Sequence, residues 1–173
     1  MSDPAADFNS AGPLSRSVKE VIARLAQSLP EGVATLSVKR RPALGVEWNS
    51  FMLTPIRPSA APIHIDVDED SGIVFLSLGR GAVFEVSPEG RRYSDLSQLD
   101  EVRALCLATI RGEFRETVWF KGEDVVGGRG WATVGSEEVG DSWRQLFTNP
   151  LRFRKKRSFE YEPYDEAELL DPA

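Results

Sequence analysis

The segment from residue 63 to residue 86 constrains the fold more than any other part of the sequence, because its pattern predicts an antiparallel meander. Residues Ile63–Asp68 alternate between apolar and polar side chains, which is typical of a strand with one buried face. After a polar turn, Ile73–Leu78 is a continuous apolar run, which predicts a strand covered on both faces. The short loop 79–81 then predicts a hairpin with Ala82–Val86.

An amphipathic helix is predicted before this meander. Val18, Ile22 and Leu25 repeat at three- and four-residue intervals and form one apolar stripe. Ser17 and Glu20 have the spacing of a capping box, although the helix has room to begin one turn earlier. We therefore expect this stripe to pack onto the sheet.

The remaining elements are predicted from similar patterns. Residues 33–40 and 45–55 are expected strands before the meander, and a second helix follows it, capped by Ser97 and ended by Gly112. The last expected elements are strands at 115–121 and 129–134, their connection at 122–128, and a short third helix at about 137–147.

Together these elements predict an α+β fold of the two-layer type. We expect an antiparallel sheet of roughly 5–7 strands with helices packed on one face, in the order α-β-β-β-β-β-α-β-β-α. With 173 residues, 41% of them apolar, the chain has enough material for one core. The expected domain spans residues 14–150, after a disordered leader at 1–13 and before a basic-then-acidic C-terminal tail at 151–173.

Composition excludes several classes of site. A single cysteine, Cys106, rules out an internal disulfide framework and a cysteine-only zinc site, and a single histidine, His64, rules out a multi-histidine metal centre. We predict no cofactor and no metal. No apolar run reaches the ~18 residues of a membrane span, and the first residues lack the pattern of a signal peptide. A cytoplasmic location is therefore expected.

The acidic run at the end of the alternating strand is one candidate site. It does not fit a calcium-binding EF-hand loop, since Ser71 and Ser77 occupy the positions that require Gly and Glu. We interpret it as an acidic face that binds a protein, in a chain whose net charge is −6. The acidic residues proposed for this face are Asp66, Asp68, Glu69 and Asp70.

His64 supports an alternative hypothesis. It lies two residues from Asp66, on the same face of the strand, and a carboxylate beside an imidazole is half of a catalytic triad. No nucleophile motif accompanies it, and Cys106 falls on an apolar helix stripe where a structural role is expected. A small-ligand sensor or an enzyme with a site near His64 and Asp66, and with Glu85 if the fold brings it close, therefore stays open.

A basic cluster follows the expected domain. Residues 151–157 contain five basic and no acidic side chains, whereas residues 158–173 contain six acidic and no basic ones. This pattern indicates a solvated or partner-docking tail and only weakly favours nucleic-acid binding, because the acidic body repels phosphates. The basic residues proposed for binding are Arg152, Arg154, Lys155, Lys156 and Arg157.

The hypothesis that best fits these patterns is a non-enzymatic protein-binding module, of the bacterial immunity-protein or secretion-chaperone/adaptor type, that docks a protein partner through its acidic face. Nucleic-acid association through the basic tail is a second alternative. Trp119 and Trp131 fall on adjacent expected strands and are predicted to pack across them. A homodimer formed through an exposed sheet edge is also open.

Overall fold

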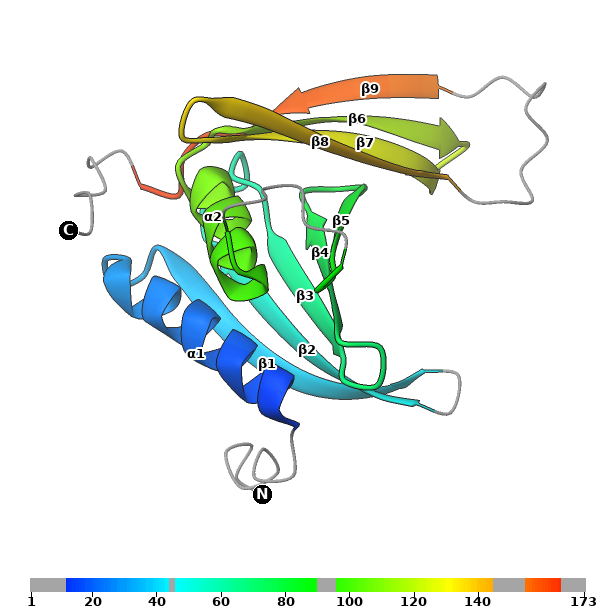
Figure 1. Ribbon diagram of the computed structural model, residues 1–173. Coiled ribbons are helices and arrows are strands. Elements are labelled where there is room, and N and C mark those ends of the chain that lie inside the picture. Colours follow the sequence, from blue (N-terminus) through cyan, green and yellow to red (C-terminus); the bar gives the residue numbers. More distant parts are fainter. Residues whose placement is uncertain (1–11, 44–45, 90–95, 145–154, 166–173) are drawn as a thin grey trace, which may run out of the picture.

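The computed structural model describes residues 12–43, 46–89, 96–144 and 155–165, and these form two antiparallel sheets and two helices (Figure 1). The α+β class, the meander and the order of the first nine elements agree with the sequence-based prediction. Of the leader predicted at 1–13, residues 1–11 lie outside the described residues, whereas Gly12 and Pro13 are ordered as the N-cap and first residue of the first helix, which corrects that end of the prediction.

The first sheet contains five strands in sequence order, each antiparallel to its neighbours. They are β1 (Ala34–Ala43), β2 (Val46–Pro55), β3 (Ile63–Asp68), β4 (Ile73–Leu78) and β5 (Ala82–Val86). In β4, Val74 and Leu76 are buried, but Ile73 and Phe75 are partly exposed. The prediction that β4 is covered on both faces is therefore wrong, because the helices cover only one face of this sheet.

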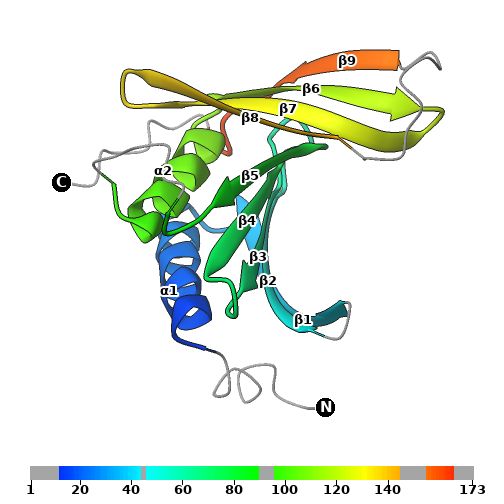
Figure 2. The same cartoon turned by 45° about the vertical axis from the view of Figure 1, so that its right-hand side comes forward.

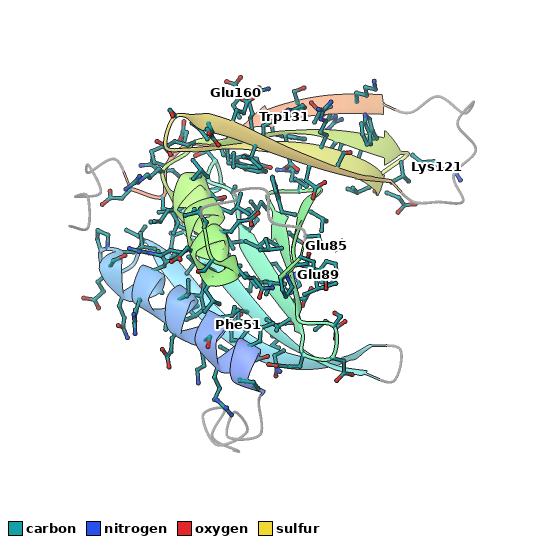
Figure 3. All side chains as sticks on the ribbon, in the orientation of Figure 1. Phe51, Glu85, Glu89, Lys121, Trp131 and Glu160 are labelled. Carbon is teal, nitrogen blue, oxygen red and sulfur yellow. The ribbon has the colours of Figure 1, made fainter. Side chains whose placement is uncertain are left out.

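Both helices pack on the same face of the five-stranded sheet (Figures 1 and 2). α1 (Pro13–Ser28) buries the predicted stripe of Val18, Ile22 and Leu25, and α2 (Gln98–Ile110) begins at the predicted cap, where the Ser97 hydroxyl accepts from the Asp100 N–H. Phe51 of β2 is fully buried beside α1 (Figure 3).

The start of α1 lies one turn before the predicted capping box. Gly12 is the N-cap and provides no side chain, and Ser17 lies inside the helix, where its hydroxyl donates to the Pro13 carbonyl. The backbone N–H groups of Leu14 and Ser15, in the first turn of the helix, donate instead to the carboxylate of Glu69 from the β3–β4 turn. Glu69, which is distant in the sequence, therefore satisfies the first N–H groups of α1 as the side chain of an N-cap residue would.

The second sheet has the strand order β8-β7-β6-β9 and packs against β5 and α2. Its strands are β6 (Phe114–Lys121), β7 (Asp124–Val134), β8 (Glu137–Arg144) and β9 (Lys155–Glu160). Two predictions are corrected here. Residues 137–144 form a strand and not a helix, because they pair along β7, and residues 155–160 form a strand and not a tail, because they pair along β6.

The predicted connection 122–128 is also shorter than expected, since β7 already begins at Asp124. Gly128 and Gly130 therefore lie within the strand, against the β4–β5 hairpin. A Cβ atom at Gly128 would lie 1.9 Å from the Gly81 carbonyl oxygen, and one at Gly130 would lie 2.5 Å from the Cβ of Ala82. These glycines let the two sheets approach to backbone contact.

Residues 161–165 cross from the second sheet back to the first. The Tyr164 hydroxyl donates to the Ala61 carbonyl at 2.7 Å, and the Tyr164 N–H donates to the Ile110 carbonyl at 2.9 Å. The Ser59 hydroxyl donates to Glu162 at 2.6 Å. This crossing joins both sheets and the end of α2.

Candidate functional site

The acidic run singled out in the sequence is divided among three structural settings. Asp66 lies on the face of the five-stranded sheet that is turned away from the helices, whereas Asp68, Glu69 and Asp70 lie at the β3–β4 turn. Glu69 is held at the N-terminus of α1, as described above. The run is therefore not one continuous acidic patch.

Asp68 closes the β3–β4 turn. Its carboxylate accepts from the Ser71 hydroxyl at 2.6 Å and from the backbone N–H groups of Asp70 and Ser71 at 3.1 and 3.4 Å. These hydrogen bonds, with that of the Ser71 hydroxyl the strongest cause, lower the pKa of Asp68 because they favour its charged form. Asp70 is exposed at the tip of the turn.

Asp66 lies between a hydroxyl and an imidazole. The Ser50 hydroxyl donates to Asp66 Oδ1, and His64 Nε2 lies 3.2 Å from the same oxygen. Within the described residues, that buried nitrogen makes no aligned hydrogen bond, and it forms an ion pair with Asp66 only when the imidazole is protonated. The side chains of His64 and Asp66 are 21% and 26% exposed, so part of each reaches the surface.

The order of these three groups decides what they can do chemically. A serine is activated when a histidine takes its proton and a carboxylate orients that histidine, which requires the histidine to lie in the middle. Here the carboxylate of Asp66 lies in the middle, and it contacts both Ser50 and His64. The group is arranged as a polar anchor on the sheet surface and not as a proton relay to Ser50.

The face that carries Asp66 is the feature that sequence reasoning missed. We call it the back face: the side chains of the five-stranded sheet that point away from α1 and α2. Strand pairing places one row of these side chains directly across the sheet. That row consists of Lys39, Ser50, Asp66, Phe75 and Glu85.

Apolar side chains lie among the acidic ones on the back face. Met52, Ile73, Phe75 and Val83 are each partly exposed. Glu85 is exposed and projects from β5 on the side away from the helices (Figure 3). The sequence contained only an ambiguous signal for this face: all but one of the residues of β4 are apolar, which predicted burial on both faces, whereas in the structure alternate residues are partly exposed.

The basic residues of the predicted tail lie on a different sheet. Lys155, Lys156 and Arg157 are exposed on β9, where the Arg157 guanidinium lies 5.6 Å from the centre of the Phe120 ring. Arg152 and Arg154 lie outside the described residues. The structure therefore does not bring the basic cluster to the back face.

Two tryptophans of the second sheet lie on its outer face, turned away from the five-stranded sheet. Trp131 is partly exposed, and the guanidinium groups of Arg115 and Arg129 lie over its ring, 4.7 and 4.9 Å from the ring centre. Trp119 is buried and pairs across the strands with Gly127, and Trp131 pairs with Arg115. The prediction that the two tryptophans pack across adjacent strands is thus wrong in register.

A buried carboxylate stabilises the junction of the two sheets. Glu116 of β6 is 1% exposed and accepts from the backbone N–H groups of Arg80 and Gly81, at 2.6 and 2.9 Å. It also accepts from the hydroxyl of Tyr161, whose pKa is raised, first by burial and then by this carboxylate. The role of Glu116 is to hold the β4–β5 hairpin under the second sheet.

Cys106 is fully buried on α2, as its position on the apolar stripe predicts. Burial raises the pKa of its thiol to about 12, so the thiol is kept in its unreactive protonated form. Across the four described ranges, no group of three or more His, Cys, Asp or Glu side chains is placed to hold a metal ion. Neither described helix is long and apolar enough to cross a membrane.

Comparisons of the chain with protein-family models, with curated proteins and with solved structures found no match. The function is therefore argued from the chemistry of the back face alone.

Proposed function

We propose that this protein is a non-catalytic protein-binding module, of the adaptor or immunity-protein type, whose back face docks a partner with a basic surface. The observation that carries the proposal is the mixture of side chains on that face. Met52, Phe75 and Val83 provide partly exposed apolar area, and Asp66 and Glu85 provide carboxylates beside it.

This mixture has the anatomy of a protein interface. Such interfaces combine an apolar centre with a polar rim, and the centre provides most of the binding free energy. The carboxylates of the back face would speed the encounter with a basic partner and orient it. Asp66 is also anchored by Ser50 and His64, so little side-chain entropy is lost when a partner binds it.

The proposal moves the interface from the acidic run to the back face. Neutralising Asp66, Asp68 and Asp70 together is a poor test of this interface, because Asp66 holds Ser50 and Asp68 closes a turn. Glu85 is a better target, since its side chain is exposed on the back face. Phe75, its neighbour across the strands, tests the apolar centre.

The experiment is capture of partners by the immobilised protein from a lysate of its source, with three variants in parallel. Glu85→Arg reverses a charge on the back face, and Phe75→Thr removes apolar area while introducing a β-branched side chain that suits a strand. Glu31→Arg is the matched control, because Glu31 is exposed in the turn between α1 and β1, away from the back face. Each variant is first shown to melt near the wild-type temperature.

We expect one stoichiometric basic protein to bind the wild type and the Glu31→Arg variant, and to be lost as salt rises. Its affinity should fall about tenfold or more in the Glu85→Arg and Phe75→Thr variants, as for a residue in an interface centre. A partner that binds all three variants equally would place the interface elsewhere. Capture of nucleic acid, or of nothing, would overturn the proposal.

A further inference from the structure

Strand β9 is the edge of the four-stranded sheet in the described part of the chain. It pairs with β6 along one side over six residues, and no described strand pairs with its other side (Figures 1 and 2). In an antiparallel ladder, alternate residues of an edge strand direct their N–H and C=O groups outward. Such an edge is a template for another strand unless its side chains prevent pairing.

The side chains on the outer face of β9 have opposite charges at its two ends. Strand pairing places Lys156, Ser158 and Glu160 on the same face as Arg115 and Trp131. Glu160 projects from β9 away from the five-stranded sheet (Figure 3). Lys156 and Glu160 thus lie two residues on either side of Ser158.

Glu160 lacks the salt bridge that its position would provide. Its cross-strand neighbour is Arg115, but the Arg115 guanidinium is hydrogen-bonded to Glu138 at 2.8 Å and stacks on Trp131. Within the described residues, neither Glu160 nor Lys156 has an ion pair or a side-chain hydrogen bond. An edge strand therefore carries two unpaired opposite charges at symmetrical positions.

We propose that β9 pairs with β9 of a second copy of this chain, antiparallel and centred on Ser158. In this register, Lys156 of each copy lies directly opposite Glu160 of the other, on the same face, and both charges are neutralised. On the other face Arg157 lies opposite Phe159, and within each chain these two side chains already contact Phe120 and Arg80, respectively. The two four-stranded sheets become one sheet of eight strands.

The order of charges along β9 favours a second copy over other extended segments. A two-fold axis through Ser158 places Lys156 of each chain opposite Glu160 of the other, so two opposite-charge pairs form. Parallel pairing in register would instead place the two Lys156 side chains opposite each other. Exposed lysines on an edge strand normally prevent another strand from pairing with it. Lys156 therefore favours only those strands that place a carboxylate directly opposite it. With six residues a side, the interface is small, and we expect dimerisation to depend on concentration.

The test is the mass of the full chain in solution, measured by sedimentation velocity over a range of protein concentrations. The wild type should move from 19.2 kDa toward twice that mass as concentration rises. Lys156→Glu places two like-charge pairs in the interface, and so does Glu160→Lys, so each should weaken dimerisation about tenfold or more. Lys121→Glu is the matched control, since Lys121 is exposed at the end of β6, one strand inward from the free edge of β9 and beyond the residues that pair with it.

Mixing the two weakened variants makes the test specific. In an equimolar mixture of Lys156→Glu and Glu160→Lys, each carboxylate of one chain again meets a lysine of the other, so a heterodimer should form. The double variant Lys156→Glu/Glu160→Lys should likewise dimerise with itself. No rescue in the mixture, equal dimerisation of all variants, a monomeric wild type at every concentration, or a dimer that forms only with bound nucleic acid would each overturn the proposal.

Discussion

At the scale of single residues, Glu116 shows how one polar group fixes the relation of two sheets. It occupies an apolar position in the alternation of β6, between the buried Phe114 and Val118. A buried carboxylate is costly unless hydrogen bonds satisfy it. The hairpin N–H groups of Arg80 and Gly81 and the hydroxyl of Tyr161 do so.

We therefore predict a graded loss of stability at Glu116. Glu116→Ala should lower the free energy of unfolding by about 3 kcal/mol or more, because it leaves several donors unsatisfied. Glu116→Gln keeps one acceptor oxygen but turns an amide toward a backbone donor, so its loss should be smaller. Tyr161→Phe, which spares the backbone hydrogen bonds, should cost about 1 kcal/mol. Urea unfolding measures all three, and a loss below about 1 kcal/mol for Glu116→Ala would contradict this role.

At the scale of elements, α1 depends on the sheet for both its packing and its cap. Its buried stripe of Val18, Ile22 and Leu25 lies against the first sheet, and Glu69 from the β3–β4 turn accepts from its first N–H groups. The helix has no side-chain cap of its own. Its stability therefore comes from tertiary contacts more than from local sequence.

Leu25→Ala tests this dependence. Leu25 is 5% exposed in the core, and its truncation should lower the free energy of unfolding by about 2–5 kcal/mol. Arg24→Ala is the control, because Arg24 is exposed and its ion pair with Glu20 at 3.6 Å contributes at most about 0.5 kcal/mol. Thermal and urea unfolding give both values. Equal losses in the two variants would remove α1 from the core.

The elements also show what the sequence could predict. The alternation of β3, the apolar stripe of α1 and the Ser97 cap of α2 are clear in the sequence, and these elements lie where the pattern indicates. β8 and β9 have no such pattern, and the sequences Glu137–Arg144 and Lys155–Glu160 become strands because β7 and β6 provide the hydrogen-bonding partners. Local propensity is overridden by tertiary pairing in both cases.

The candidate site was predicted less well than the fold. The same-face placement of His64 and Asp66 followed from strand alternation, and the structure brings them together. That Ser50 would join them, and that Glu85 would lie in the same row as Asp66, depended on the register of four strands. Register is set by long-range pairing, which one sequence does not specify.

At the scale of the whole molecule, the two sheets share one core. Phe114 and Ala132 of the second sheet belong to the same buried cluster as Val18 of α1 and Ile65 of β3. Gly128 brings β7 against the β4–β5 hairpin, and Tyr164 joins α2 to the first sheet. Contacts of this kind couple the parts of a small protein into one cooperative unit.

We accordingly predict a single unfolding transition. Trp119, Trp131 and Trp143 lie on strands of the second sheet, so tryptophan fluorescence reports chiefly on that sheet. Far-ultraviolet circular dichroism at helical wavelengths reports on α1 and α2, which pack on the first sheet. The two signals should give the same midpoint in urea. Separate midpoints would show that the sheets unfold independently.

The crossing at residues 161–165 has a consequence for how the chain folds as it is synthesised. Tyr164 is hydrogen-bonded to Ala61, and Glu162 to Ser59, in each case across 103 residues of sequence. These hydrogen bonds can therefore form only long after the meander has been synthesised. Until those residues are made, β6 lacks its partner strand β9, and the end of α2 lacks its contact with Tyr164. Contacts between residues so far apart in the sequence also form slowly. A nascent chain of this protein is therefore open to aggregation or to chaperone binding from the synthesis of the meander until residues 161–165 have emerged.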